Sequence, residues 1–301
     1  MTSVGDGRRA RPLEPPYLLT TMTDRHGVAV TVAGDATTAV VEMAAHGEWS
    51  PHLGDQISAG LRLCLAGPSV SILIDLHQLD DPFGLSMPFW MAAWRQARLA
   101  PSPVCMVFCL SSTSMLGQRL RTAEGERPRL FTTAPEARIA IAAGISHLDR
   151  LQARLSPRPD CLRDVRDLAE QACRVWRLPH LLDDASLIAS ELASNAIEHA
   201  GTDFVVTLSR NASRLHVAVQ DGAHEFPRPD RPSSASPWVS LHPRGRGLLL
   251  VHTIAAAWGV MPARGGKVVW ATLITSGSAS GLSRRSTVVS RPGIEAVREQ
   301  A

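Results

Sequence analysis

Apolar and polar residues follow two alternating patterns along the first half of this 301-residue chain. Continuous apolar runs, typical of buried strands, alternate with segments whose apolar residues recur every three or four positions, as on one face of a helix. Ser50 and Pro51 predict a helix start before one such segment, and Thr133 with Glu136 has the spacing of a capping box. This alternation of strand and helix predicts a small α/β domain over residues 36–143.

The second half shows a different order of elements. Residues 161–275 begin with an amphipathic helical pattern, followed by a second helix, two strand-like runs, a helix that starts at glycines, and closing strands. This order predicts a mixed sheet covered on one face by helices, an α/β two-layer sandwich. Residues 144–160 contain the break SPRP and are predicted to be a linker. Residues 1–35 are predicted to be a mobile leader with one strand near residues 27–32, and residues 276–301 a disordered tail.

Three polar residues recur at steps of four within the otherwise apolar stretch DDASLIASELASNAIEHA. They are Glu191, Asn195 and His199, and their spacing places them on one helical face. Asn is a poor helix former, and the chain has only one other, Asn211, so a mid-helix Asn195 indicates a specific task. His199 is expected to lie at the helix C-terminus, where the helix dipole favours it, rather than to act as a ligand.

Further along, a strand-like run ends in an Asp-Gly pair and a later apolar run begins with glycines. RLHVAVQD ends at Asp221 and is followed by Gly222, and Gly245, Arg246 and Gly247 open GRGLLLV. A nucleotide site needs an oxygen ligand for Mg²⁺, an acceptor for the adenine amine, a carboxylate that orients a nucleophile, and bare N–H groups at a helix start. Together these features favour nucleotide binding over the alternative, a solvated helix face and an ordinary Asp-Gly turn.

These motifs also carry a family resemblance. Residues 161–275 resemble the ATP-binding domain of bacterial anti-sigma factors with serine kinase activity, in the GHKL superfamily: ELASNAIEHA is similar to its Asn-containing box, QDG to its Asp-Gly box, and GRGLLLV with GGKVVWATL to its glycine boxes and closing strand. The resemblance implies ATP and Mg²⁺ as cofactors, with Glu191 as the catalytic base, Asn195 on the magnesium and Asp221 on the adenine. It implies a nucleotide-binding role for the residues Asp221, Gly222, Gly245, Arg246, Gly247 and Leu248.

Two departures from that family pattern concern nucleotide affinity. Where the family often shows Asp-x-Gly, Asp221 is followed directly by Gly222, so the glycine comes one place early. Where many relatives carry Thr after the Gly-Gly pair, this chain has Lys267, so a hydroxyl that helps to hold adenine is expected to be missing. The proline-rich segment 226–243 is predicted to be a lid over the nucleotide.

The first half resembles the STAS fold of anti-sigma factor antagonists, on GEWSPHL, LIDLHQLDDPFGLS and TTAPEARIAI. In that family the turn after the central strand commonly reads Asp-Ser-Ser-Gly and carries the serine that a partner kinase phosphorylates. Here the turn reads DPFG, with Phe83 in place of the acceptor, and the nearest hydroxyl, Ser86, suits a helix N-cap. We therefore predict a fixed or degenerate docking surface unless Ser86 is phosphorylated.

The two resemblances together imply a fusion of a STAS-type antagonist domain with a GHKL/HATPase_c-type, serine kinase-like domain. The leading hypothesis is an anti-sigma regulatory factor that binds ATP and Mg²⁺, phosphorylates a serine or threonine of a separate STAS-type antagonist, and regulates transcription by partner switching with a sigma factor. The alternative is a catalytically inactive, nucleotide-sensing scaffold, which Phe83 and Val268 favour. A sensor histidine kinase fragment is disfavoured, since no long dimerising helix with an acceptor His precedes residue 161. The sequence leaves open whether the chain forms a homodimer.

Composition narrows the partners and the compartment. The formal net charge of +3 is small and the arginines are dispersed, which argues against nucleic acid as a direct partner. The first residues lack the apolar core of a signal peptide and no apolar run reaches membrane-spanning length, so we expect a cytoplasmic protein without a membrane partner. The five cysteines, odd in number and without metal-type spacing, are predicted to be buried thiols. Lys267 is the only lysine.

Overall fold

The computed structural model describes residues 17–18, 22–24, 27–69, 71–100, 103–144, 149–211, 213–226 and 246–275. Its strands are β1 (Tyr17–Leu18), β2 (Met22–Asp24), β3 (Gly27–Asp35), β4 (Val40–Glu48), β5 (Ser71–Asp80), β6 (Cys105–Cys109), β7 (Arg129–Phe131), β8 (Arg150–Leu155), β9 (Phe204–Asn211), β10 (Arg214–Asp221), β11 (Ala257–Ala263) and β12 (Gly266–Ile274). Its helices are α1 (Pro51–Ala66), α2 (Met87–Leu99), α3 (Met115–Thr122), α4 (Ala134–Ala142), α5 (Cys161–Val175), the 3₁₀ turn η2 (Pro179–Leu181), α6 (Leu182–Asn195), the π-helical turn η3 (Ala196–Ala200) and α7 (Arg246–Ile254).

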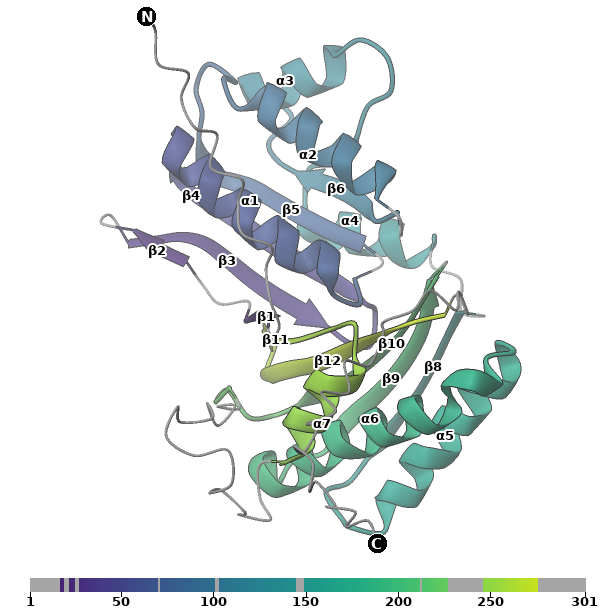
Figure 1. The fold of residues 1–301 in the computed structure, drawn as a ribbon. Helices are drawn as coiled ribbons and strands as arrows, with labels where there is room; N and C mark the ends of the chain where they lie inside the picture. The colour runs from purple at the N-terminus through teal and green to yellow at the C-terminus, as the bar shows by residue number, and fades with distance from the viewer. Residues whose placement is uncertain are drawn as a thin grey trace, which may run out of the picture.

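These strands form one continuous sheet, which confirms the predicted α/β class (Figure 1). Its order is β7-β6-β5-β4-β3-β11-β12-β10-β9-β8, with β1 beside β11 and β2 beside β3. The pairs from β4 to β7 are parallel, whereas those linking β8 to β12 are antiparallel. The halves of the chain meet where β3 pairs with β11 in parallel, at Gly34 and Ala263.

Local signals start the helices of the first half where the sequence predicts them. Ser50 has an extended backbone and its Oγ accepts the backbone N–H of Leu53 at 3.2 Å, so it caps α1. Thr133 caps α4 in the same way, accepting from the N–H of Glu136 at 3.3 Å. These two caps orient α1 and α4 so that they cover opposite faces of the parallel sheet, each over its own buried cluster.

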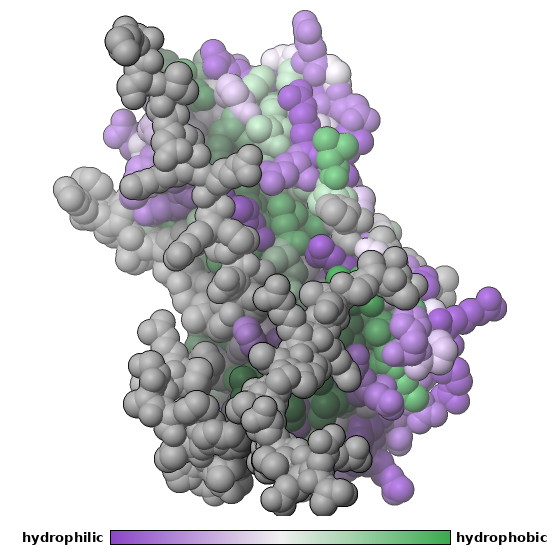
Figure 2. All heavy atoms as spheres, viewed as in Figure 1, coloured by the Kyte–Doolittle hydropathy of each residue, from purple (hydrophilic) through white to green (hydrophobic). Residues whose placement is uncertain are grey.

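The antiparallel sheet of the second half is covered on both faces. Helices α5, α6 and α7 lie on one face, and α5 turns a hydrophilic side to the surface at the lower right of Figure 2. The other face meets the first half, where Trp270 and Met261 are buried in the same cluster as residues of α1 and β3. A Cβ at Gly34 would lie 2.3 Å from the Met261 sulfur, and one at Gly67 would lie 3.4 Å from the Trp270 ring. The halves therefore share a core instead of standing apart as separate domains.

The boundaries differ from the predicted ones at two places. Strand β8 lies inside segment 144–160, which the sequence analysis assigned to a linker, and it forms the sheet edge beside β9. Its alternating partly buried and exposed residues give a weak apolar signal, as an edge strand does. Strand β3 confirms the strand predicted near residues 27–32, but it joins the two halves, so this part of the predicted leader, 1–35, belongs to the sheet. The predicted tail, 276–301, and all but residue 226 of the predicted lid lie outside the described residues.

Four of the five cysteines are buried, as predicted, but Cys105 is exposed at the start of β6. The prediction was wrong there because successive side chains of a strand face opposite sides: Val104 and Met106 are buried, whereas Cys105 between them, at the first position of β6, is exposed. Burial raises the pKa of the Cys64 thiol to about 12, which keeps it protonated and inert. No helix among the described residues has both the length and the apolarity that a membrane crossing requires.

We expect His216 to make the protein sensitive to acid. It is buried on β10, with its Nδ1 2.8 Å from the Thr272 hydroxyl, and burial lowers its pKa from 6.5 to about 3. Below pH 6.5 this histidine binds a proton in the unfolded chain but stays neutral in the folded protein. The free energy of unfolding therefore decreases as the pH is lowered. Between pH 7 and 5 the loss from this residue is about 2 kcal/mol in free energy of unfolding.

Urea denaturation of the wild type and His216→Gln at both pH values measures this effect. The variant removes the titrating ring but keeps a polar group near Thr272. Its loss of stability between pH 7 and 5 is expected to be smaller than that of the wild type by about 2 kcal/mol. The same loss in both proteins would contradict the assignment.

Candidate functional site

Helix α6 presents the first two predicted site residues. Ile188 and Leu192 are fully buried and fasten α6 to the sheet, which turns the intervening side of the helix away from the core. Glu191 and Asn195 lie on that side, one helical turn apart, and both are partly buried. The helical placement predicted from the spacing is therefore confirmed for both residues.

The carboxylate of Glu191 lies against the start of α7. A Cβ built on Gly247 would come within 2.3 Å of the Glu191 Oε2, so a side chain at this position would push the carboxylate away from the start of α7. Partial burial raises the pKa of Glu191, and the nearby charge of Glu198 raises it further. A carboxylate with a raised pKa beside a helix N-terminus is suited to accept a proton close to bound phosphates.

Asn195 ends α6, where the backbone widens into the π-helical turn η3. Its Nδ2 is buried and has no hydrogen-bond partner among the described residues. Such turns occur often at functional sites, and a buried amide without a partner is costly unless a ligand satisfies it. Rotation of the amide exchanges its two ends, so the side chain can offer an oxygen, the ligand that Mg²⁺ prefers. The residue therefore fits a metal-bound nucleotide.

His199 does not join this site. It is exposed on η3, consistent with the predicted position at the helix end. Gly201 then ends the helix in a left-handed conformation with φ of 60°, and its N–H donates to the Ala196 carbonyl at 3.1 Å.

Asp221 lies at the end of β10, directly opposite Lys267 on β12. The Lys267 Nζ donates to the Asp221 Oδ1 at 2.9 Å, and the side chains are 2% and 1% exposed, respectively. The backbone N–H of Ala223 donates to the same oxygen at 2.8 Å. The other oxygen, Oδ2, is buried without a partner among the described residues. One oxygen of Asp221 is therefore engaged by Lys267 and Ala223. The second oxygen can accept a hydrogen bond from a donor such as an adenine amine.

Lys267 is the site residue whose role the sequence analysis missed. The sequence marks it twice, as the only lysine and as the residue in place of a family threonine. Its pairing with Asp221 depends on the register of β10 and β12, which places residues 46 positions apart directly opposite each other. An ammonium group thus stands where the family resemblance implies a hydroxyl.

Glycines let the surrounding backbone approach Asp221. The N–H of Gly222 donates to the Thr202 hydroxyl at 2.9 Å, and a Cβ at Gly222 would lie 3.0 Å from that oxygen. Gly266 has φ of 158°, and a Cβ there would lie 1.8 Å from the Asp221 carbonyl oxygen. These contacts join the segment after η3, the Asp-Gly turn and the β11–β12 hairpin at the predicted base-binding end of the site.

Of the predicted phosphate-binding residues, three lie in α7 and one lies outside the described residues. Arg246 is the first residue of the helix, and Gly247 follows it against Glu191. The side chain of Leu248 packs against the core, so only its backbone faces the helix start. Gly245 is not among the described residues. No cluster of three His, Cys, Asp or Glu side chains suited to a metal occurs in the described part of the chain.

Ser86, the candidate phosphoacceptor of the first half, is not accessible at the surface. Ser86 is fully buried, its Oγ donates to Asp81 at 2.5 Å, and the Trp90 indole donates to it at 3.0 Å. Ser86 stands at the N-cap position of α2, but its side chain makes no cap bond, so the predicted capping role of its hydroxyl is wrong; Asp81 accepts the backbone N–H groups of Leu85 and Ser86, the two residues before the helix. Phe83 is 69% exposed on the same turn. This turn leads into α2 in the upper part of Figure 1, whereas α6 and α7 lie in the lower part.

Comparison with known proteins agrees with the geometry of the second half. Residues 155–273 match the family model of the histidine kinase-like ATPase domain. Among solved structures, the crystal structure of an anti-sigma factor antagonist from Mycobacterium paratuberculosis is similar with a TM-score of 0.31 and 13% sequence identity, covering 43% of this chain and 98% of that chain. No curated protein sequence matches the chain.

Proposed function

We propose that this protein binds ATP with Mg²⁺ and transfers the γ-phosphoryl group to a serine or threonine of a separate STAS-type antagonist, within a partner-switching system that controls a sigma factor. The match of residues 155–273 to a histidine kinase-like ATPase domain supports nucleotide binding. The observation that carries the proposal is the placement of Glu191 against the start of α7, one turn before Asn195, whose Nδ2 has no partner among the described residues.

Each residue has a role that its surroundings suit. Glu191 takes the proton of the attacking hydroxyl as the new oxygen–phosphorus bond forms and the bond to the bridging β–γ oxygen breaks, which releases ADP. The free oxygen of Asp221 accepts from the adenine amine, and the N–H groups that open α7 hold phosphate oxygens. Asn195 would bind Mg²⁺, which neutralises phosphate charge when bound.

The hydroxyl comes from another protein because this chain offers none at the equivalent turn. Phe83 has no hydroxyl, and Ser86 is buried with its Oγ bonded on both sides. Phosphorylation of Ser86 would break both bonds and place a charged group in the core, at a large free-energy cost. The first half therefore serves as a fixed part of the regulator, and its exposed Phe83 belongs to a surface that phosphorylation does not switch.

Nucleotide binding to the full chain tests the proposal most directly. We expect the wild type to bind ATP at least about tenfold more tightly with Mg²⁺ than with EDTA, and Asn195→Ala to lose that difference. Asn211→Ala is the matched control, since it changes the only other asparagine, at the end of β9. Isothermal titration measures both constants. The absence of ATP binding by the wild type would overturn the proposal.

A nucleotide-sensing scaffold without catalysis is the second candidate. The ion pair of Asp221 with Lys267 favours it, because an ammonium group stands where the family resemblance implies a hydroxyl that helps to hold adenine, so this end of the site departs from that of the family's kinases. Incubation with labelled ATP and a panel of STAS-type antagonists separates the two functions. Tight ATP binding with no labelled antagonist would favour the scaffold over the kinase.

A further inference from the structure

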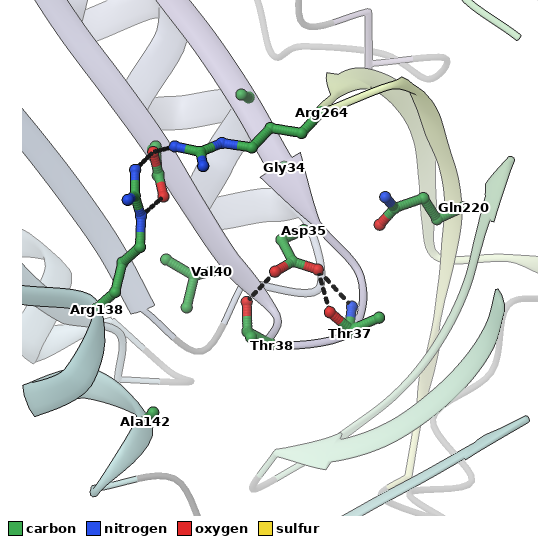
Figure 3. Close-up of a pocket in the computed structure, with 11 residues that line it drawn as sticks. Gly34, Asp35, Thr37, Thr38, Val40, Arg138, Ala142, Gln220 and Arg264 are labelled. Carbon is green, nitrogen blue, oxygen red and sulfur yellow. Dashed lines mark hydrogen bonds and ion pairs between the residues drawn. The ribbon is translucent and has the colours of Figure 1, made fainter. Parts of the chain in front are cut away.

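A pocket of about 320 Å³ lies at the junction of the two halves (Figure 3), and none of the predicted nucleotide-site residues lines it. We propose that it binds a small anion with a net charge of about −1 that presents a carboxylate or phosphate group, and that occupancy of the pocket changes the surroundings of Asp221. The volume is at the lower end of the range for small-molecule sites.

Both halves of the chain build the walls of this pocket. Asp35 ends β3, Thr38 lies in the turn between β3 and β4, and Arg138 comes from α4. Gln220 comes from β10, and Arg264 from the hairpin between β11 and β12. A ligand here would therefore contact the first half and the nucleotide-binding half at once.

One end of the pocket carries an excess positive charge. Arg138 binds Glu42 with two donors, its Nε to Oε1 and its Nη2 to Oε2, the latter at 2.7 Å. Arg264 donates to the same Oε2 at 3.3 Å, so two guanidinium groups converge on one carboxylate (Figure 3). Arg264 is 72% exposed and has no other partner among the described residues, so its remaining donors are free for an anion.

The other end of the pocket is neutral. Asp35 accepts from the backbone N–H of Thr37 and from the Thr38 hydroxyl, both at 2.8 Å, which occupies its two oxygens. Arg150 lies outside the lining of the pocket, but the charge of Asp35 acts on its partly buried guanidinium, whose Nη1 donates to the Thr37 carbonyl. The charges of Asp35 and Arg150 offset each other, whereas Arg138 and Arg264 together carry one positive charge more than Glu42 neutralises. A single negative charge on the ligand balances the pocket.

The pocket touches the strand ends that hold the base-binding pair. Successive residues of a strand face opposite sides, so Gln220 faces the pocket while Asp221 faces the helices. Gln220 accepts the Ala36 N–H at 3.0 Å and so ties this strand end to the first half. Arg264 leads through two glycines to Lys267, the partner of Asp221. An anion on Arg264 would therefore shift the hairpin that sets this pair; this coupling rests on the proposed nucleotide site, whereas anion binding does not.

The first experiment measures anion binding to the full chain without nucleotide. The probes are inorganic phosphate and L-glutamate, titrated at constant ionic strength with chloride as the background. We expect both to bind, and Arg264→Gln to weaken binding about tenfold. Arg158→Gln is the matched control, because Arg158 has the same exposed fraction of 72% and also makes an ion pair, but lies outside the pocket. No binding by the wild type, or equal weakening in both variants, would overturn the site.

The second experiment measures the affinity for a fluorescent ATP analogue with and without L-glutamate. Glutamate is used because phosphate would also compete for the phosphate positions of the nucleotide. We expect a change of about threefold or more in the wild type and none in Arg264→Gln. Anion binding with an unchanged nucleotide affinity would overturn the coupling. A failure to bind nucleotide at all, with anion binding intact, would count against the proposed function and not against the anion site.

Discussion

Lys267→Met is expected to lower the free energy of unfolding by about 3–5 kcal/mol, one of the largest single-residue effects in this chain. The substitution removes the partner of Asp221 and leaves a carboxylate that is 1% exposed without its cation. Methionine keeps all but the last atom of the side chain, so the loss reflects mainly the charge pair rather than a cavity. Chemical denaturation followed by tryptophan fluorescence measures the change.

Two further variants make this result specific. Lys267→Met combined with Asp221→Asn should recover a large part of the stability, because no uncompensated charge is then buried. Arg154→Met breaks an exposed pair with Asp203, whose atoms lie 3.8 Å apart, and should change stability by less than about 1 kcal/mol. Lys267→Met as stable as the wild type would show that Asp221 does not depend on its cation.

Glu191→Gln is expected to reduce phosphoryl transfer by about 10²- to 10⁴-fold while leaving ATP affinity within about twofold. Glutamine has nearly the same shape and can still lie against Gly247, but it cannot take a proton. Transfer of labelled phosphate to an antagonist, together with the nucleotide titration, separates the two quantities. Transfer at the wild-type rate would remove Glu191 from the mechanism.

The pH dependence of transfer distinguishes a base from a structural carboxylate. Burial and the charge of Glu198 raise the pKa of Glu191, so the rate should increase with pH through a value above the ordinary range of a glutamate. Glu198→Gln removes the like charge and should move this rise to lower pH, with the rate at high pH unchanged. A profile that does not move would contradict the role of Glu198 in setting the pKa.

Local sequence signals were sufficient for much of the fold and for part of the site. Ser50 and Thr133 act within their own helix turns, so these starts follow from neighbouring residues alone. The helical spacing of Glu191 and Asn195 likewise placed both on one face. Strand β8 was not predicted, because an edge strand buries few apolar side chains and so shows a weak apolar pattern. Its position depends on pairing with β9, about fifty residues later in the chain.

The amino-acid sequence by itself determined the two α/β halves, the helix that carries Glu191 and Asn195, and the Asp-Gly end of β10, since each depends on residues close together in the chain. Only the tertiary structure decided that the halves share a core and that Lys267 pairs with Asp221. It also decided that an arginine-rich pocket forms between the halves. The physical reason is that sheet register and helix packing bring together residues far apart in sequence, and burial then sets how strongly their charges interact.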